Sequence, residues 1–404
     1  MVNNITAKKP DNEMKPLTAI GLMSGTSMDA IDLAVIESNG GENISFGPSG
    51  SVAYTMAERG LLDNAMQKAR TCDGPVPLTG VFAEAAGLVT QKHAYAVKTF
   101  LKEHELKARD IDLLGFHGQT ILHRPEEKYT CQIGDGRALA RLTGIDVIGD
   151  FRLADMRAGG QGAPLAPLYH EALCTKLLGK DNVAILNLGG VGNVTFINNK
   201  TILAFDTGPG NALLDDWMML KTGRPLDEQG AMARKGVIND ALLSVWMSHP
   251  YFDKAAPKSL DRQGFTTAGL EDLSVEDGAA TLTAFTVNSI LKAEGLLETP
   301  PMTWIICGGA RHNDFMMNYL SRVLKGKVMT AEAAGWPGDE LEAQAFAWLA
   351  IRSRYGLPLT LPETTGCNQP TGGGVYYSSR DASSSGGEIT SIDGLSGTAS
   401  RSSR

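Results

Sequence analysis

Small and acidic residues gather in one segment near the start of the chain. Residues 24–27 read Ser-Gly-Thr-Ser, and Asp29 and Asp32 follow them, within AIGLMSGTSMDAIDLAVIE (residues 19–37). Consecutive small residues let backbone N–H groups converge on an anion, because no Cβ obstructs the approach. The carboxylates suit the water shell of a magnesium ion bound to phosphate, or they cap the turn. The segment therefore predicts either a phosphate loop or an ordinary polar hairpin turn.

Two further glycine turns follow apolar runs later in the chain. LNLGGVGNV contains Gly189 and Gly190, and CGGA contains Gly308 and Gly309. Neither turn matches GxxxxGK[ST] or opens a βαβ unit with GxGxxG, which disfavours a P-loop and a Rossmann dinucleotide site. A glycine pair alone marks only a tight turn. Several such turns at the ends of apolar strands favour a cradle that grips a polyphosphate.

Two carboxylates stand beside expected helix starts. Asp206 lies where the apolar run ILAF meets Asp-Thr-Gly-Pro-Gly-Asn, so its carboxylate would have a positive helix N-terminus nearby and would suit a general base. The alternative is an N-cap or Asx-turn aspartate that closes the helix. Glu342 follows Gly338 by four residues at the beginning of a long helical pattern. Its bland interpretation is a first-turn acid favoured by the helix dipole.

A histidine and an arginine complete the candidate residues. His117 in FHGQT follows an apolar run and precedes a glycine, which predicts an exposed hydrogen-bonding loop, although a lone histidine is more often structural than catalytic. Arg152 in GDFRLAD stands shortly before Gly-Gly-Gln-Gly-Ala-Pro (residues 159–164). Together they would form an anion-binding wall, or else an interdomain ion-pair partner and a linker.

Length and charge narrow the class of protein. At 404 residues the chain is expected to form two domains that share a cleft. A net charge of -8 without a dense basic run argues against nucleic-acid binding. The polar start and the lack of a long apolar run predict no secretory signal and no membrane span, hence a cytoplasmic protein. The five cysteines are scattered, so we expect reduced thiols without a metal or redox role.

The hydrophobic patterns predict the elements that carry these residues. We expect a hairpin over residues 19–37, a helix over 80–106 followed by a strand in IDLLGFHGQT, and a second strand pair around the turn at 189–190. TWIICGGARHN predicts a strand, a turn and a helix, and GDELEAQAFAWLAIRSRYG predicts a long helix. Alternating helices and buried strands indicate an α/β fold. From Ser378 onward the composition predicts a disordered tail.

Taken together, these motifs resemble the anhydro-N-acetylmuramic acid kinase family from about Ala19 to Tyr377. Eight segments stand in the expected order: GLMSGTSMDAID, GFHGQT, QIGDGRALARLTGIDVIGDFR, GGQGAPLAP, LNLGGVGNVT, FDTGPGNALLD, CGGARHN and GDELEAQAFAWLA. Ala30 stands where the family usually has glycine, and Val191-Gly192-Asn193 replaces the more frequent Ile-Ala-Asn. The resemblance implies an α/β fold of two ribonuclease-H-like (actin-like ATPase) domains flanking an interdomain cleft. The domains would span residues 17–150 and 151–377, with a disordered tail at 378–404.

The resemblance also implies roles for individual residues. Asp206 would be the catalytic base, and His117, Thr120, Arg152 and Glu342 would contact the sugar. Binding of ATP, together with Mg²⁺ whose protein ligands are unknown, is implied for Gly25, Thr26, Ser27, Met28, Asp29, Ala30, Ile31, Asp32, Gly189, Gly190, Gly308 and Gly309.

The family reaction hydrolyses the 1,6-anhydro ring of 1,6-anhydro-N-acetylmuramic acid as it phosphorylates O6, in cell-wall recycling. The resemblance thus implies an anhydrosugar and ATP as partners and a homodimer, while the charge and the apolar pattern predict no nucleic acid or membrane partner. Two alternatives stay open at this point. One is a kinase for another anhydrosugar such as levoglucosan, and the other is a non-catalytic clamp that closes on a nucleotide.

Overall fold

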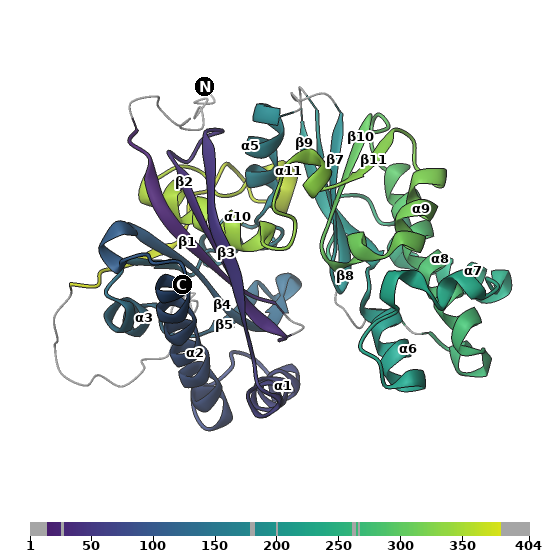
Figure 1. Cartoon of the computed structure of the whole chain (residues 1–404), viewed down its shortest axis with the longest axis horizontal. Helices are drawn as coiled ribbons and strands as arrows, with labels where there is room; N and C mark the ends of the chain where they lie inside the picture. The colour runs from purple at the N-terminus through teal and green to yellow at the C-terminus, as the bar shows by residue number, and fades with distance from the viewer. Residues whose placement is uncertain are drawn as a thin grey trace, which may run out of the picture.

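A computed structural model describes residues 14–25, 28–177, 182–198, 201–260, 264–265 and 267–380. Within these residues the chain forms two β-sheets with helices around both, which is a mixed α/β fold (Figure 1). The expected tail beyond residue 380 lies outside the described residues. No helix of the described part is both long and apolar enough to cross a bilayer.

The first sheet has the strand order β12-β6-β4-β1-β2-β3, and β5 pairs with β4. The hairpin predicted near the start of the chain is confirmed, since β1 and β2 pair antiparallel, whereas β1 and β4 run parallel. The strands span Leu17–Ser24 (β1), Ala30–Ser38 (β2), Ile44–Ala53 (β3), Leu113–Arg124 (β4), Tyr129–Ile133 (β5), Val147–Gly149 (β6) and Val375–Tyr377 (β12).

The second sheet has the order β11-β10-β7-β8-β9. The predicted strand pair around the 189–190 turn is confirmed as β7 and β8, which are antiparallel, and β10 lies parallel between β7 and β11. The strands span Val183–Leu188 (β7), Val191–Ile197 (β8), Ile202–Pro209 (β9), Thr303–Cys307 (β10) and Lys327–Thr330 (β11).

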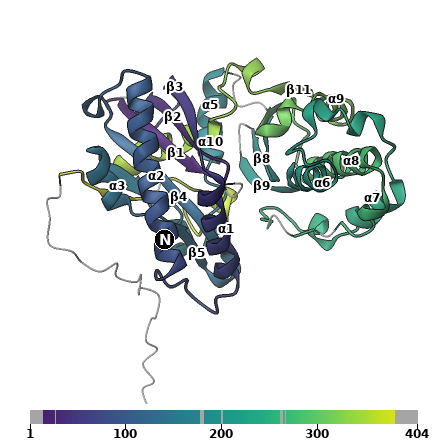
Figure 2. The ribbon, with the colours of Figure 1, turned by 60° about the horizontal axis from the view of Figure 1, so that its bottom comes forward.

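Helices cover both sheets. Figure 2 shows α1, α2 and α3 around the first sheet and α6, α7, α8 and α9 around the second. The predicted helices at 80–106 and 338–356 are confirmed as α2 and α10. The helices span Met56–Arg70 (α1), Val81–Glu103 (α2), Gly136–Thr143 (α3), Leu153–Arg157 (α4), Pro167–Leu177 (α5), Ala212–Thr222 (α6), Asp240–Met247 (α7), Val275–Glu294 (α8), Asp314–Val323 (α9), Leu341–Arg354 (α10) and Pro362–Thr365 (α11).

Helix α10 packs closely on the first sheet, against β1, β2 and β4. Gly21 of β1 and Gly115 of β4 permit this contact, because a Cβ on either would overlap the helix backbone at Ala343 or Phe346. Residues 343–352 of α10 are all buried, so the helix is covered on every side and does not present a single apolar stripe. This packing fixes the start of α10, and with it Glu342, relative to the sheet.

One buried cluster contains residues of both sheets. It joins Ala19 and Leu113 of the first sheet and Ile185 and Ile305 of the second to side chains of α5 and α10. A hydrogen bond of 2.8 Å from the Tyr169 hydroxyl of α5 to Gln344 Oε1 of α10 crosses this layer. The two sheets therefore share a core through these helices.

The end of the described chain returns to the first sheet. Strand β12 pairs with β6, and α10 packs on β1. The predicted range 151–377 assigns this segment to the second domain, whereas its pairing joins it to strands of the range 17–150. The segment pairs there because β6 would otherwise be an edge strand with unpaired backbone groups, and β12 supplies their hydrogen-bond partners.

Candidate active site

The loop between β1 and β2 is held from the neighbouring strand β4. The Ser24 hydroxyl donates to Gln119 Oε1 at 2.6 Å, and the Gln119 amide donates to the Gly25 carbonyl at 3.2 Å. The Met28 N–H closes the turn on the same carbonyl, with Met28 at a φ of 56°. Thr26 and Ser27, both predicted to bind ATP, lie outside the described residues.

Beyond this loop the backbone enters β2 at Ala30, and Ile31 packs into the core of the first sheet. Asp29 forms an exposed ion pair of 3.0 Å with Arg59. Ile31 is thus a core residue, so any contact that it makes with a nucleotide is through its backbone.

Asp32 of β2 lies near the acids at the start of α10. Burial and, to a smaller extent, the negative charges of Glu342, Glu340, Asp339 and Asp29 together raise the pKa of its carboxyl to about 7. No group of three or more His, Cys, Asp or Glu side chains that could hold a metal ion occurs among the described residues. Mg²⁺ in kinases is held by one or two carboxylates and by substrate phosphates, and Asp32 with its acidic neighbours fits that arrangement.

His117 is buried in the middle of β4, which corrects the prediction of an exposed loop. The strand continues to Arg124, and the imidazole packs on the Phe346 ring with centroids 4.6 Å apart. Arg152 donates to His117 Nε2 at 2.9 Å, so Nε2 must accept and Nδ1 carries the proton that it donates to the Gly118 carbonyl. Burial and the charge of Arg152 hold the pKa of His117 well below its usual range, so the ring is neutral.

Arg152 retains donors that other residues do not use. Its Nη1 donates to the Gly162 carbonyl at 2.7 Å, and Nε and Nη2 point to His117. Of the five N–H groups of a guanidinium, these contacts account for three, which leaves two without a partner among the described residues. Burial lowers the pKa of Arg152 to about 10, opposed by Glu342 and Asp155, so the group stays charged at neutral pH.

Glu342 links the two sheets. Its Oε1 accepts from Asn187 Nδ2 of β7 at 3.3 Å. The side chain remains accessible to solvent, but the protein packed around it raises the pKa of its carboxyl, and the positive charge of Arg152 opposes this rise. Thr120, also predicted to contact the sugar, accepts at Oγ1 from Gln132 Nε2 at 3.1 Å.

The glycine turns of the second sheet pack against each other. Gly210 and Asn211 donate from their N–H groups to the carbonyls of Gly190 and Gly189, at 3.1 and 2.7 Å. Gly308, with a φ of 75°, approaches the same hairpin so closely that a Cβ would lie 2.7 Å from the Leu188 carbonyl. The structure thus brings together the two glycine turns that the sequence analysis predicted to act jointly.

Asp206 lies within β9 and not at the start of a helix. The strand continues to Pro209 past a bulge at Gly192 and Asn193, and α6 begins only at Ala212, with Asn211 as its N-cap. Of the two alternatives, the N-cap interpretation is therefore excluded. Helix α6 nevertheless follows the Gly-Pro-Gly-Asn segment, as the sequence predicts, with its N-cap five residues after Asp206.

The carboxylate of Asp206 is half-buried and partly satisfied. Its Oδ2 accepts from the Leu260 N–H at 2.7 Å, and no hydrogen bond from another described residue reaches Oδ1. Around it, the Tyr251 hydroxyl donates to the Asp206 carbonyl and the Asp206 N–H donates to the Lys258 carbonyl. Burial raises the pKa of the Asp206 carboxyl, the bond from the Leu260 N–H opposes this rise, and the resulting pKa is about 7.

Sequence reasoning missed the residues that hold these groups in place. Gln119, Asn187, Asn211 and Arg311 each bind a backbone or side chain of a predicted residue. Arg311 is buried, donates to the Gly308 carbonyl at 3.0 Å and pairs with Glu332 and Asp339. All four occur inside the matching strings, but nothing in their spacing distinguishes them from ordinary polar residues.

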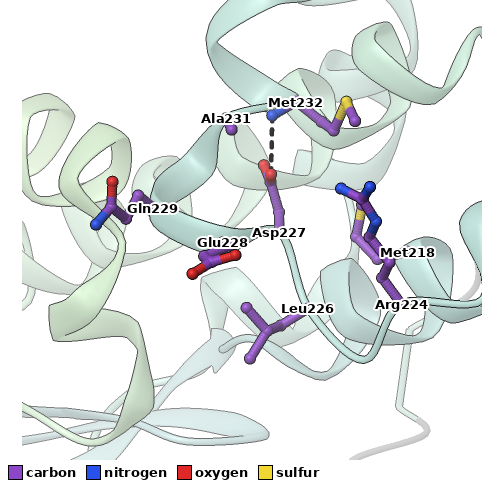
Figure 3. Close-up of a pocket in the computed structure, with 8 residues that line it drawn as sticks. All are labelled: Met218, Arg224, Leu226, Asp227, Glu228, Gln229, Ala231 and Met232. Atoms are coloured by element: carbon purple, nitrogen blue, oxygen red, sulfur yellow. Dashed lines mark hydrogen bonds between the residues drawn. The ribbon is translucent and has the colours of Figure 1, made fainter.

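One pocket of the second sheet's helical side lies apart from these residues (Figure 3). It has a volume of about 230 Å³, below the range of about 300–1,000 Å³ that is typical of small-molecule sites. Asp227 in its wall accepts from the Met232 N–H, so its carboxylate serves the local backbone. None of the predicted site residues lines it, and we assign it no role.

Comparison with known proteins identifies close relatives. The family model described as anhydro-N-acetylmuramic acid kinase matches residues 17–379. Curated proteins with that name are 49% identical over 370 residues in Methylobacterium nodulans and 49% over 362 residues in Rhodopseudomonas palustris, and each match covers 89% of this chain. The matches cover 99% and 98% of those relatives.

Among solved structures, component A of (R)-2-hydroxyglutaryl-CoA dehydratase from Acidaminococcus fermentans has a TM-score of 0.45 and 12% identity. That match covers 84% of this chain and 99% of the other. At this level of similarity we draw no conclusion from it.

Proposed function

The chain belongs to the anhydro-N-acetylmuramic acid kinase family, and from this membership we propose that it is an ATP-dependent kinase of 1,6-anhydro-N-acetylmuramic acid. In the proposed reaction water adds to the anomeric carbon, the bond from that carbon to O6 breaks, and O6 takes the γ-phosphoryl group of ATP. The products are N-acetylmuramic acid 6-phosphate and ADP, in cytoplasmic recycling of the cell wall.

The observation that carries this proposal is the state of Asp206. A general base works best when its pKa lies near the operating pH, and burial raises the pKa of this carboxyl to about 7. Its Oδ2 is occupied by the Leu260 N–H, while Oδ1 has no donor among the described residues. We assign to Oδ1 the proton of the water that attacks the anomeric carbon.

The glycine turns are assigned to the nucleotide. Gly189 and Gly309 leave open space or ordinary contact where a Cβ would stand, so backbone N–H groups there are accessible to phosphate oxygens. Asp32 would hold Mg²⁺ together with those oxygens, and the cation would offset charge on the transferred phosphoryl group. A positive ion beside Asp32 would also favour the charged form of its carboxyl.

Arg152 favours the muramic substrate over levoglucosan. The muramic sugar carries a lactyl carboxylate, and the two unused N–H groups of the guanidinium suit a carboxylate, because charge-assisted pairs of this kind are often bidentate. Levoglucosan has no such group. We therefore assign Arg152 to the lactyl carboxylate and Glu342, His117 and Thr120 to the remaining sugar contacts.

The proposal includes the architecture implied by the family. Each sheet would belong to one ribonuclease-H-like domain, with ATP in the cleft between them. The segment 341–377 would return to the domain of residues 17–150, and two chains would form a homodimer.

The substitution Asp206→Asn tests the mechanism. The variant keeps the shape of the side chain but not the base, so it should fold and bind ATP while turnover falls by about 10³-fold or more. Turnover is measured by ADP release, and nucleotide binding by calorimetry. Near-normal turnover would refute the role of Asp206, and the absence of any turnover in the parent chain would favour the non-catalytic clamp.

Mass spectrometry identifies the product, and turnover rates with the two anhydrosugars identify the preferred substrate. With the muramic anhydrosugar, the product should have the mass of the substrate plus one water and one phosphoryl group. A product that lacks the added water would mean that the ring stays closed. Faster turnover of levoglucosan than of the muramic sugar would overturn the proposed substrate.

A further inference from the structure

Asp155 is a fully buried carboxylate that the proposed reaction does not use. Its side chain is 0% exposed, and it stands in the short helix α4, three residues after Arg152. A buried carboxylate persists in a folded protein only when hydrogen bonds or a positive charge compensate for lost water. Here Oδ2 accepts from the Gly162 N–H at 2.7 Å, and Oδ1 accepts from two threonine hydroxyls.

The same glycine is bound from both sides. Asp155 binds the Gly162 N–H, and Arg152 Nη1 binds the Gly162 carbonyl at 2.7 Å. A side chain is excluded at this position, because Gly162 has a φ of 71° and a Cβ would lie 2.8 Å from the Met156 side chain. Gly160 in turn leaves no room between its Cα and the Asp155 carboxylate for a Cβ. The orientation of Arg152 therefore depends on where Asp155 holds this loop.

The threonines come from a distant part of the chain. Thr360 precedes α11 and Thr365 is its last residue, and each is 1% exposed. Their hydroxyls donate to Asp155 Oδ1 at 2.5 and 2.6 Å. The backbone adds two bonds, from the Gln161 N–H to the Thr365 carbonyl and from the Asn368 N–H to the Ala158 carbonyl. The segment 360–368 thus holds the glycine loop against α4. We call the hydrogen bonds that join Asp155, Thr360, Thr365 and this loop the clasp.

We propose that Asp155, Thr360 and Thr365 are positioning residues that fix Gly162 and, through it, the Arg152 guanidinium against the carboxylate of the substrate. The inference rests on the proposed function, in which Arg152 binds that carboxylate. It assigns part of the specificity for a charged anhydrosugar to a clasp that does not touch the sugar. Loss of the clasp should let Arg152 change its orientation without disturbing the nucleotide turns of the second sheet.

The test compares Thr360→Val and Thr365→Val with Thr360→Ser and Thr365→Ser. Valine preserves the shape but removes the donor, and each single valine variant retains the other hydroxyl, whereas serine keeps the donor. Loss of one hydrogen bond to a charged group should raise KM for the muramic sugar about tenfold, with kcat and KM for ATP within about twofold. The serine variants should behave as the parent, and thermal unfolding checks that all four variants fold.

A neutral analogue separates positioning from general damage. The inhibition constant of 1,6-anhydro-N-acetylglucosamine, which lacks the lactyl carboxylate, should not change in the valine variants. An equal loss of affinity for both sugars would overturn the proposal. Arg152→Met distinguishes the proposed binding role of Arg152 from the proposed positioning role of the clasp. If this variant leaves KM for the muramic sugar unchanged, the role of Arg152 is refuted. If it raises KM while the valine variants do not, only the role of the clasp is refuted.

Discussion

Burial acts on the charged groups of the candidate site in different directions. It raises the pKa of Asp206 to about 7, lowers that of Arg152 to about 10, and keeps His117 neutral. At neutral pH the arginine is therefore charged, the histidine accepts its hydrogen bond, and the aspartate is poised between its two forms. These states are the ones that a carboxylate-binding arginine and a general base require.

The pH dependence of kcat/KM for the sugar tests the state of Asp206. The base form is needed for proton transfer, so below a pKa of about 7 kcat/KM should fall about tenfold per pH unit, with a plateau above. The measurement is made at saturating Mg²⁺ and ATP, because the cation that we propose beside Asp32 would keep that second carboxyl ionised. A flat profile through this range would contradict Asp206 as the base.

Single residues also show where sequence reasoning stops. The motifs marked Asp206 and Arg152, but apolar periodicity could not reveal that β9 continues past a bulge or that His117 is covered by Phe346. Both depend on contacts with residues far away in the sequence. Asp155 and Asn187 gave no signal, because their roles exist only through partners on other elements.

At the scale of elements, strand and turn patterns proved informative because they are local. The glycine turns at 189–190 and 308–309 follow strands of the second sheet, and both can be recognised from an apolar run that ends in two glycines. Their mutual packing could not be predicted, since it depends on Gly210 and Asn211 binding the first turn. Some of these glycines are therefore needed for the fold, whereas others leave space beside the backbone for a ligand.

Alanine substitutions should separate structural from ligand-binding glycines. Gly308→Ala should lower the free energy of unfolding by about 1–3 kcal/mol, because the left-handed φ and the nearby Leu188 carbonyl oppose a Cβ. At Gly189 a Cβ meets nothing within 4 Å, so Gly189→Ala should leave stability unchanged but raise KM for ATP if phosphate approaches there. Denaturant unfolding and ATP titration measure the two effects. An unchanged KM for ATP in Gly189→Ala would argue against this turn as a phosphate contact.

Over the whole molecule, buried histidines lie in two separate parts of the core. His170 of α5 has a hydrogen bond of 2.9 Å with Thr195 of β8, in the core that joins both sheets, whereas His93 of α2 packs edge-on against Phe116 of β4, on the α2 side of the first sheet. Burial lowers the pKa of each to about 4. As pH falls, the lowered histidine pKa values decrease the stability of the folded protein, whereas the raised carboxyl pKa of Asp206 increases it. The stability of the parent chain in acid therefore reflects both effects.

A variant of His93 isolates the loss of stability in acid that a single buried histidine causes. Histidine in the unfolded chain titrates near 6.5, whereas folded His93 binds a proton only near pH 4. Between these values the unfolded state takes up the proton, so stability is lost as pH falls, by about 3 kcal/mol in all. His93→Leu removes this group, and its stability relative to the parent should therefore rise by that amount between about pH 7 and pH 4. Urea unfolding at both pH values measures it, with Val89→Ala on the same helix as a core change that has no titrating group. If the difference between His93→Leu and the parent does not vary with pH, His93 takes up its proton at the same pH in the folded protein as in the unfolded chain, and the buried core of the first sheet admits charge.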